Sequence, residues 1–315
     1  MDRPLGQFPA EQSAAGEFER QPDEFRDWVR ADGSTAFAPQ PGRYHLYVSL
    51  ACPWAHRTLI VRRLKCLEKM IGVTVVDPIR TAEDGWAFRD GPGFSRDPIN
   101  GFAFLREAYV ATNPRFRGRW TVPVLWDKQL RRIVNNSEDD ICRMFNDEFG
   151  ADPATPELFP EVLAQQQADL SSEIYENINN GVYRAGFATE QNAYERAVRS
   201  VFQLLDTLET RLATRRYLFG AHWVETDWRL FCTLVRFDAV YHGHFKCNLR
   251  RIVDYANLGE YLRDLYQVPG IAETVNFDHI KRHYYVTHTD INPTGIVPLG
   301  PVLDLAAPHG RAGLG

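Results

Sequence analysis

Cysteine is scarce in this chain of 315 residues, and its cysteines are not arranged for cross-linking. The five are Cys52, Cys66, Cys142, Cys232 and Cys247. Their number is odd and no two follow Cys-x-x-Cys spacing, which argues against a disulfide framework and against a zinc ribbon. We therefore expect reduced thiols and a cytoplasmic location.

The sequence also lacks long apolar runs and an excess of positive charge. Its strongest apolar runs are as short as Leu59-Ile60-Val61, far below the roughly 20 residues needed to cross a bilayer. The stretch from Met1 to Arg30 is polar and acidic, without the apolar core of a secretory signal. With a formal net charge of −5, no broad basic surface is predicted for nucleic acid. We expect no membrane and no nucleic-acid partner, and instead a small molecule or another protein.

The length and the pattern of the chain predict two domains. Residues 1–43, rich in Gly, Pro, Ala and acidic side chains, read as an N-terminal extension. Residues 44–148 predict an α/β domain, with a strand at Tyr44–Val48, a helix from Pro53 to near Lys69 and a parallel strand at Val73–Val76. A long irregular insertion spans residues 78–119, and a hairpin and a helix near Ser137 follow it.

The second half of the sequence is helical. Prolines interrupt residues 149–160, which we interpret as a linker. Within the helical domain, residues 161–285, apolar residues recur at helical spacing in four stretches, namely Gln165–Asn179, Ala193–Ala213, Asp227–Tyr241 and Leu258–Gln267. Residues 286–315 are predicted to form an extended tail, because the prolines between Asn292 and Pro298 oppose a helix.

Cys52-Pro53 stands where the first strand passes into the first helix. The sulfur would face unpaired amide N–H groups and the positive end of the helix dipole, and both favour thiolate over thiol. Proline suits the first helical turn because it has no N–H to leave unpaired. A buried structural cysteine is the alternative, and position alone does not decide between the two.

Val122-Pro123 precedes the predicted hairpin. A cis peptide bond here would present the Val122 backbone to an extended peptide ligand, whereas a trans proline at a sheet edge is the commoner state. Val122-Pro123 follows Cys52 in the order that a thioredoxin fold requires.

Several motifs together resemble one family. Tyr47–Thr58, which reads Tyr-x-Ser-Leu-Ala-Cys-Pro-Trp-Ala-His-Arg-Thr, looks like the signature of the glutathionyl-hydroquinone reductases, the Xi-class glutathione transferases. Further similar segments are Asn180–Ala188, Leu234–Asp238, Tyr241–Asn248, Ile280–Tyr285 and Ile291–Pro298. The resemblance runs from about Arg43 to Pro301. It implies the glutathione-transferase fold, α/β plus all-α, in which a thioredoxin-like domain precedes a helical domain and the aromatic site lies between them.

The resemblance also implies a glutathione site. Trp86 would cover one side of the tripeptide, Arg119 would pair with its glycyl carboxylate, and the Val122 backbone before Pro123 would bond its cysteinyl amides. Glutathione transferases normally hold the γ-glutamyl group with Glu or Gln followed by Ser. Here the order is reversed, Ser137-Glu138, and which side chain takes which role stays open.

Three tyrosines match positions that surround the aromatic substrate in that family. They are Tyr183, Tyr241 and Tyr284, with Tyr285 as the alternative to Tyr284. A phenol can donate a hydrogen bond to a phenolic oxygen while its ring packs against the quinol. For any single tyrosine, a purely structural place in the core is the competing interpretation.

The implied reaction is glutathione-dependent removal of glutathione from glutathionylated aromatic quinols by Cys52, in a protein that forms homodimers. An omega-like thioltransferase or dehydroascorbate reductase would share the cysteine without requiring the tyrosines, and a non-catalytic scaffold would not require the cysteine. Histidines with ligand spacing occur at His242-x-His244, near Cys247, and at His279 with His283. No carboxylate motif accompanies them and the family uses no metal, so we predict none.

Overall fold

The structure, a computed structural model, describes residues 11–150 and 154–315 and divides them into two compact units. The strand unit contains residues 21–150, 154–157 and 274–283, and the helical unit contains residues 11–20, 158–273 and 284–315. The expected N-terminal extension is therefore shared, with residues 21–43 in the strand unit and 11–20 in the helical unit. Residues 1–10 of that extension and residues 151–153 of the expected linker lie outside the described residues.

The strand unit is built on a four-stranded mixed sheet with the order β2-β1-β3-β4. Its strands are β1 (Tyr44–Val48), β2 (Ile71–Val75), β3 (Val124–Asp127) and β4 (Arg132–Asn135). β1 pairs with β2 in parallel and with β3 in antiparallel orientation. All five residues of β1 are buried, as expected for an aromatic and β-branched strand covered on both faces. The predicted parallel crossover and hairpin are confirmed.

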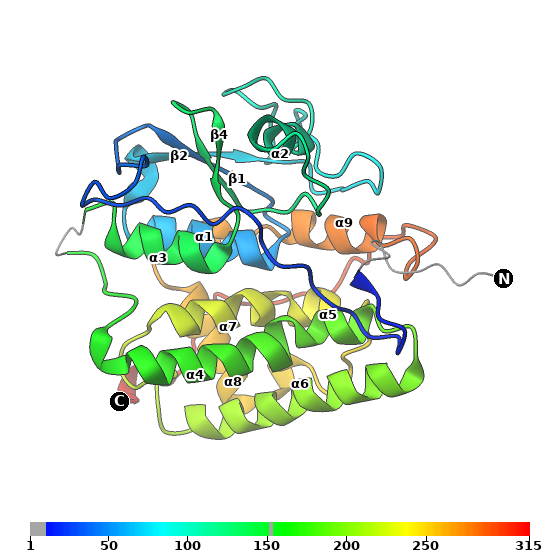
Figure 1. The fold of residues 1–315 in the computed structure, drawn as a ribbon. Helices are drawn as coiled ribbons and strands as arrows, with labels where there is room; N and C mark the ends of the chain where they lie inside the picture. Colours follow the sequence, from blue (N-terminus) through cyan, green and yellow to red (C-terminus); the bar gives the residue numbers. More distant parts are fainter. Residues whose placement is uncertain (1–10, 151–153) are drawn as a thin grey trace. The chain divides into compact units, whose positions relative to one another are not determined.

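Helices pack on both faces of this sheet. α1 (Pro53–Leu64) and α3 (Glu138–Asp147) pack against each other along one face, and α2 (Arg106–Thr112) contacts β4 on the other (Figure 1). α1 ends earlier than predicted because Cys66 adopts a left-handed φ of 55°, and a short 3-10 turn, Leu67–Lys69, follows it. The insertion 78–119 is not irregular throughout, since it contains α2, which is too short for its periodicity to be recognised.

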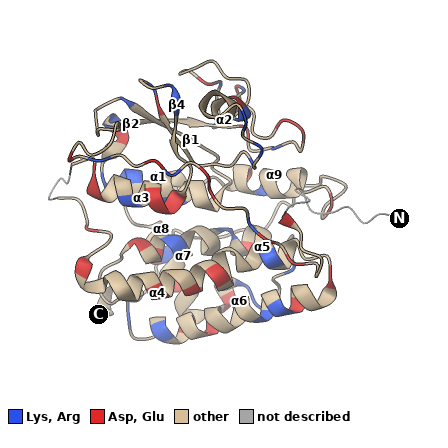
Figure 2. Ribbon diagram, in the orientation of Figure 1, with Lys and Arg blue, Asp and Glu red and all other residues tan. Residues whose placement is uncertain are grey.

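The helical unit contains α4 (Ala164–Ile174), α5 (Gly181–Gly186), α6 (Gln191–Leu212), α7 (Glu225–Arg236) and α8 (Ala256–Tyr266). Turns of π-helix, Tyr175–Asn179 and Phe237–Tyr241, continue α4 and α7, so these two helical stretches end where the periodicity predicted. Every residue of α7 is buried. α6, by contrast, has an apolar face and carries charged side chains elsewhere (Figure 2). Short 3-10 turns occur at Glu161–Leu163, Ile252–Asp254, Ala272–Thr274 and Arg311–Gly313.

The last helix, α9 (Phe277–Thr287), was not expected from periodicity. Its residues up to His283 belong to the strand unit and those from Tyr284 onward to the helical unit. The tail after α9 is mostly without regular structure, as predicted, but it is fastened to the helical unit. The buried Arg311 donates hydrogen bonds to the carbonyl oxygens of Leu212 at 2.9 Å and Arg216 at 3.0 Å.

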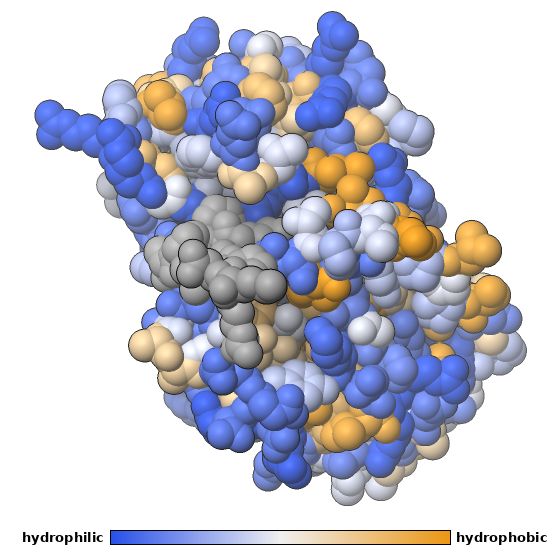
Figure 3. Space-filling view, turned by 90° about the vertical axis from the view of Figure 1, so that its right-hand side faces the viewer, coloured by the Kyte–Doolittle hydropathy of each residue, from blue (hydrophilic) through white to orange (hydrophobic). Residues whose placement is uncertain are grey.

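No helix in the described part of the chain is long and apolar enough to span a membrane. On the face shown in Figure 3, hydrophobic residues form small patches separated by hydrophilic ones. Scattered patches of this kind are ordinary on protein surfaces.

Candidate functional site

Cys52 lies at the N-terminus of α1. It is the N-cap residue, with φ −76° and ψ 121°, and Pro53 follows as the first helical residue. Its carbonyl oxygen accepts a hydrogen bond from the His56 N–H at 3.0 Å, and its side chain is half-buried. The thiol therefore belongs to the end of the helix where backbone N–H groups lack intrahelical partners and the dipole is positive.

The strand unit brings Val122 next to this cysteine. The Cys52 thiol donates to the Val122 carbonyl oxygen, with Sγ 3.5 Å from it. The Val122–Pro123 peptide bond is cis, one of the two states that the sequence left open, and both residues are buried. Among the described residues, none accepts a hydrogen bond from the Val122 N–H.

Ser137 and Glu138 stand at the N-terminus of α3. Ser137 is the buried N-cap residue, but its hydroxyl makes no capping bond, and its N–H instead donates to Asn135 Oδ1 at 2.7 Å. Glu138 is the first helical residue and is half-buried. The reversed pair thus still places a hydroxyl and a carboxylate at a helix N-terminus.

An ion pair that the sequence did not reveal connects the two helix ends. Arg57 of α1 is fully buried and pairs with Asp139 in the first turn of α3. Because a buried guanidinium needs a charged partner, this pair fixes the start of α3 relative to α1. Only the packing of α1 on α3 reveals it.

Trp86 is buried in the insertion. Its ring stacks on the ring of His283 in α9, with centroids 5.0 Å apart and an interplanar angle of 22°. His283 donates from Nδ1 to the Pro78 carbonyl oxygen at 2.7 Å. Trp86 is therefore packed within the strand unit, and a role in covering glutathione stays a prediction. Arg119 lies half-buried in the loop that leads to Val122, and its expected role is also a prediction.

Two other histidines with ligand spacing, His279 and His244, bond to groups within the protein. His279 donates from Nε2 to the Pro92 carbonyl oxygen at 2.7 Å. His244 and His288 are both buried, and their ring nitrogens lie 3.1 Å apart. In residues 11–150 and 154–315, no group of three or more His, Cys, Asp or Glu side chains is placed to hold a metal ion.

The helical unit brings the three predicted tyrosines together. The Tyr284 hydroxyl lies 2.5 Å from that of Tyr183 and 2.9 Å from that of Tyr241. Tyr285 does not join them, because its hydroxyl donates to the Ala239 carbonyl oxygen at 3.4 Å. Burial raises the pKa of Tyr241 and Tyr284 well above the ordinary phenol value, so both hydroxyls stay protonated at neutral pH.

Phe245 supports this tyrosine cluster (Tyr183, Tyr241 and Tyr284). Its ring stacks on Tyr241, with centroids 5.6 Å apart and an interplanar angle of 19°, and contacts Tyr183 edge-on. The close approach depends on Gly186, because a Cβ at that position would overlap the Phe245 ring. The segments Asn180–Ala188 and Tyr241–Asn248 contain these residues, but their contact was not evident from the sequence.

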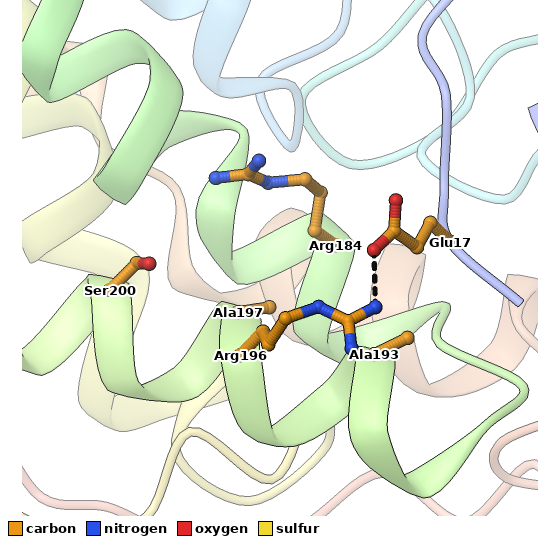
Figure 4. Close-up of a pocket in the computed structure, with 6 residues that line it drawn as sticks. All are labelled: Glu17, Arg184, Ala193, Arg196, Ala197 and Ser200. Atoms are coloured by element: carbon orange, nitrogen blue, oxygen red, sulfur yellow. Dashed lines mark hydrogen bonds and ion pairs between the residues drawn. The ribbon is translucent and has the colours of Figure 1, made fainter. Parts of the chain in front are cut away.

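A separate pocket of about 220 Å³ lies in the helical unit near α5 and α6. Glu17, Arg184, Ala193, Arg196, Ala197 and Ser200 line it (Figure 4). Arg196 pairs with Glu17, with Nη2 and Oε1 2.5 Å apart, whereas the Arg184 guanidinium points away from that pair. None of the predicted site residues lines this pocket.

Comparison with known proteins places the chain in a family. Residues 51–148 match the glutathione S-transferase N-terminal domain, and residues 191–264 match the C-terminal domain. Over 307 residues the chain is 52% identical to the glutathionyl-hydroquinone reductase YqjG of Escherichia coli, covering 95% of this chain and 93% of YqjG.

Solved structures agree with this placement. The glutathione-bound structure of YqjG matches with a TM-score of 0.88 and 52% identity, over 91% of this chain and 96% of that one. The glutathione S-transferase Xi of Phanerochaete chrysosporium matches with a TM-score of 0.89 and 48% identity, over 92% of this chain and 95% of that one. Together with the arrangement of thioredoxin-like sheet and helical domain, these similarities show that the chain belongs to the glutathionyl-hydroquinone reductases, the Xi class of the glutathione S-transferases.

Proposed function

We propose that this chain removes glutathione from glutathionyl-hydroquinones, with Cys52 as the nucleophile and glutathione as co-substrate. The observation that carries the proposal is the 52% identity to a glutathionyl-hydroquinone reductase over nearly the whole chain. The position of Cys52 at the N-terminus of α1 supports it, because a thiolate is the reactive form of cysteine.

In the first step the Cys52 thiolate attacks the glutathionyl sulfur. A sulfur–sulfur bond forms, the bond between sulfur and the aromatic carbon breaks, and its electron pair stays with the ring. A proton then completes the hydroquinone. In the second step a glutathione thiolate attacks the Cys52–glutathione disulfide, which releases oxidised glutathione and restores the Cys52 thiolate. The cycle needs no second cysteine.

We assign the glutathione-binding role to the residues around Cys52. The Val122 N–H, which has no acceptor among the described residues, is suited to bond the cysteinyl backbone of the tripeptide. Ser137 and Glu138 would hold the γ-glutamyl group at the N-terminus of α3, and Trp86 and Arg119 would contact the rest. The glutathione-bound structure of YqjG supports glutathione as the ligand of this fold.

The tyrosine cluster would act on the phenolic oxygens of the substrate. The Tyr284 hydroxyl lies 2.5 Å from that of Tyr183 and 2.9 Å from that of Tyr241, and either oxygen of each pair can be the donor. Tyr241 is fully buried, so its hydroxyl hydrogen has to be donated within the cluster, since a buried donor without an acceptor is costly. Tyr183 is half-buried, whereas Tyr241 and Tyr284 are fully buried, so Tyr183 is the tyrosine that we expect to donate to the substrate.

Replacing each tyrosine with phenylalanine tests the assignment. Tyr183→Phe keeps the ring but deletes the donor, so turnover of glutathionyl-hydroquinone should fall about tenfold or more, as expected for loss of about 1.4 kcal/mol in the transition state. Tyr241→Phe and Tyr284→Phe should also reduce turnover, because each deletes a hydroxyl from the hydrogen-bonded cluster that orients Tyr183. Reduction of a simple glutathione mixed disulfide, which has no phenolic oxygen, should be nearly unchanged.

The ratio of the two activities decides the outcome. Parallel losses in both reactions, or no loss in either, would reject the quinol substrate and leave the Cys52 chemistry standing, as in a thioltransferase. Mass spectrometry of the intact protein mixed with a glutathionyl-hydroquinone should show Cys52 carrying one glutathione, and Cys52→Ser should show none. A wild-type protein that forms no adduct and turns over neither substrate would favour a non-catalytic scaffold.

A further inference from the structure

Residues 11–20, which we call the N-terminal segment, contact Tyr183 of the tyrosine cluster. The guanidinium carbon of Arg20 lies 5.0 Å from the centroid of the Tyr183 ring, within the distance of a cation–π interaction. The Phe18 ring lies beside it, with its centroid 6.4 Å from that of Tyr183 and 5.4 Å from that of Phe187. Phe18 is buried and Arg20 is half-buried.

Several bonds fix this segment to α5 and α6. Arg20 donates from Nε to Asn180 Oδ1 at 3.0 Å, immediately before α5. The Gly16 carbonyl oxygen accepts a hydrogen bond from the Thr189 N–H at 3.1 Å. Glu17 pairs with Arg196 at the pocket in Figure 4, which also ties the segment to α6. The position of Arg20 is thus fixed by the backbone hydrogen bond at Gly16 and by its own hydrogen bond to Asn180.

A guanidinium over a phenol ring has a defined electrostatic effect. It attracts electron density in the ring and favours negative charge on the attached oxygen, which makes the hydroxyl a stronger hydrogen-bond donor. The effect is strongest where water is excluded, as around the half-buried Tyr183 ring with Phe18 and Phe245 beside it. The planar guanidinium can stack on the ring and bond Asn180 at the same time, which a lysine ammonium does not reproduce.

We propose that Arg20 is a positioning residue for the reaction, which holds the Tyr183 ring and strengthens donation from its hydroxyl to the phenolic oxygen of the substrate. The inference rests on the proposed function and adds a role for the N-terminal segment in quinol specificity. It assigns no contact between Arg20 and the reacting sulfur atoms. Arg20 should therefore matter for the aromatic substrate and not for thiol–disulfide exchange at Cys52.

The test compares Arg20→Gln and Arg20→Lys with the wild-type enzyme. Arg20→Gln removes the charge, so kcat for glutathionyl-hydroquinone should fall about fivefold to tenfold, whereas the KM for glutathione and the reduction of a simple mixed disulfide should stay within about twofold. Arg20→Lys keeps the charge but loses the planar stacking and the Nε donor, and its kcat should lie between those of the wild-type enzyme and Arg20→Gln. Arg199→Gln is the matched control, because it makes the same charge change at the exposed partner of Glu195 on α6.

A double-mutant cycle with Tyr183→Phe separates positioning from a general structural effect. In the Tyr183→Phe background, Arg20→Gln should cost less than about twofold, because the hydroxyl on which Arg20 acts is gone. Thermal unfolding of each variant verifies that it is folded. The proposal would be overturned if the loss of quinol turnover in the double variant equals the product of the losses in the two single variants. Equal losses of quinol turnover and of mixed-disulfide reduction in Arg20→Gln would also overturn it. A folded Arg20→Gln variant with wild-type quinol turnover would do so as well.

The same measurements distinguish a wrong role for Arg20 from a wrong substrate. If the quinol is not the substrate, the wild-type enzyme itself does not turn it over and Tyr183→Phe has no selective effect. If only the role of Arg20 is wrong, wild-type turnover and the selective loss in Tyr183→Phe persist, and Arg20→Gln behaves like Arg199→Gln.

Discussion

At the scale of the residue, the expected reactivity of Cys52 comes from its position. It is the N-cap residue of α1, followed by Pro53, so its sulfur belongs to the positive end of the helix dipole. Cys247, by contrast, lies inside the helical unit, where burial raises the pKa of its thiol to about 12. Two cysteines of one chain are therefore expected to differ greatly in reactivity.

We predict that the Cys52 thiol has a pKa below the free value of about 8.5. The rate of alkylation by iodoacetamide, followed by mass spectrometry of the Cys52 peptide, should rise through an inflection below that pH. Cys247 in the same digest should stay unmodified over the same range and is the internal control. An inflection for Cys52 at or above the free-cysteine value would show that the helix N-terminus does not activate it.

A second prediction at this scale concerns the reversed pair. If Ser137 and Glu138 together hold the γ-glutamyl group, Ser137→Ala and Glu138→Ala should each weaken glutathione binding by about 1–3 kcal/mol, the range for a hydrogen bond to a charged group. Calorimetric titration with glutathione measures this. Asp147→Ala, at the last residue of the same helix, is the control and should bind normally. Unchanged affinity in both site variants would place the γ-glutamyl group elsewhere.

At the scale of the element, α5 and α7 show how single positions decide the packing of a helix. Gly186 ends α5 and lets the Phe245 ring approach the helix backbone. Asp227 lies in the first turn of the buried α7 and accepts hydrogen bonds from the N–H groups of Leu218 and Val224, both at 2.9 Å. The Tyr261 hydroxyl also donates to it, at 2.8 Å.

We expect Gly186→Ala to be destabilising although alanine favours helices. Its Cβ would overlap the Phe245 ring, so the ring must move away from Tyr183 and Tyr241, at a cost of about 1–3 kcal/mol for an overpacked core. Urea unfolding should show that loss, and quinol turnover should fall more than mixed-disulfide reduction. Gly181→Ala is the control in the same helix. The nearest atom to its Cβ would be a terminal methyl of Val201 at 3.0 Å, so the required shift is much smaller than that of the Phe245 ring. Equal stability of the two variants would show that the Phe245 contact is not critical.

Asp227 gives a prediction for the pH dependence of stability. Burial raises the pKa of its carboxyl to about 6, although the hydrogen bonds from Leu218, Val224 and Tyr261 oppose this. Because the folded state then binds the proton more tightly than the unfolded state, the contribution of this group to stability is full below about pH 4 and is lost as the pH rises toward 6. The free energy of unfolding of the wild-type protein minus that of Asp227→Asn, measured with urea, should therefore decrease from pH 4 to pH 6. A constant difference across that range would contradict the raised pKa.

At the scale of the whole molecule, the chain is two compact units, each with its own part of the proposed chemistry. The strand unit carries Cys52, Val122, Ser137 and Glu138, and the helical unit carries the tyrosine cluster and Arg20. The proposed reaction requires both, since the first set is assigned to glutathione and the second to the quinol. Substitutions in the tyrosine cluster or at Arg20 are for this reason expected to reduce quinol turnover more than they reduce thiol–disulfide exchange at Cys52.

The family resemblance also predicts that the protein forms a homodimer. Light scattering during size-exclusion chromatography should give twice the chain mass of 36.1 kDa. The dimer should persist on dilution to the concentration used in the activity assays. A mass equal to that of one chain at all concentrations would contradict the prediction.

The order of the strands, the longer helices up to α8 and the position of Cys52 followed from the sequence alone because their signals are local. The apolar strand Tyr44–Val48, the proline after Cys52 and the helical periodicity beyond residue 161 each depend on neighbouring residues. Short elements were not predictable in this way. α2 and α5 contain too few turns for a periodic pattern, and they exist because the surrounding structure packs against them.

The meeting of distant side chains was decided by tertiary structure. The hydroxyls of Tyr183 and Tyr284 touch across 101 positions of sequence, and Arg20 reaches Asn180 across 160. The resemblance to a family pointed to the tyrosines, but no local pattern identified Arg20, Phe245 or the Arg57–Asp139 pair. Such contacts depend on which helix faces pack together, and that follows from burial of the whole apolar surface rather than from any one segment. The sequence determined the chemistry that the chain carries, and the packing decided which groups act together.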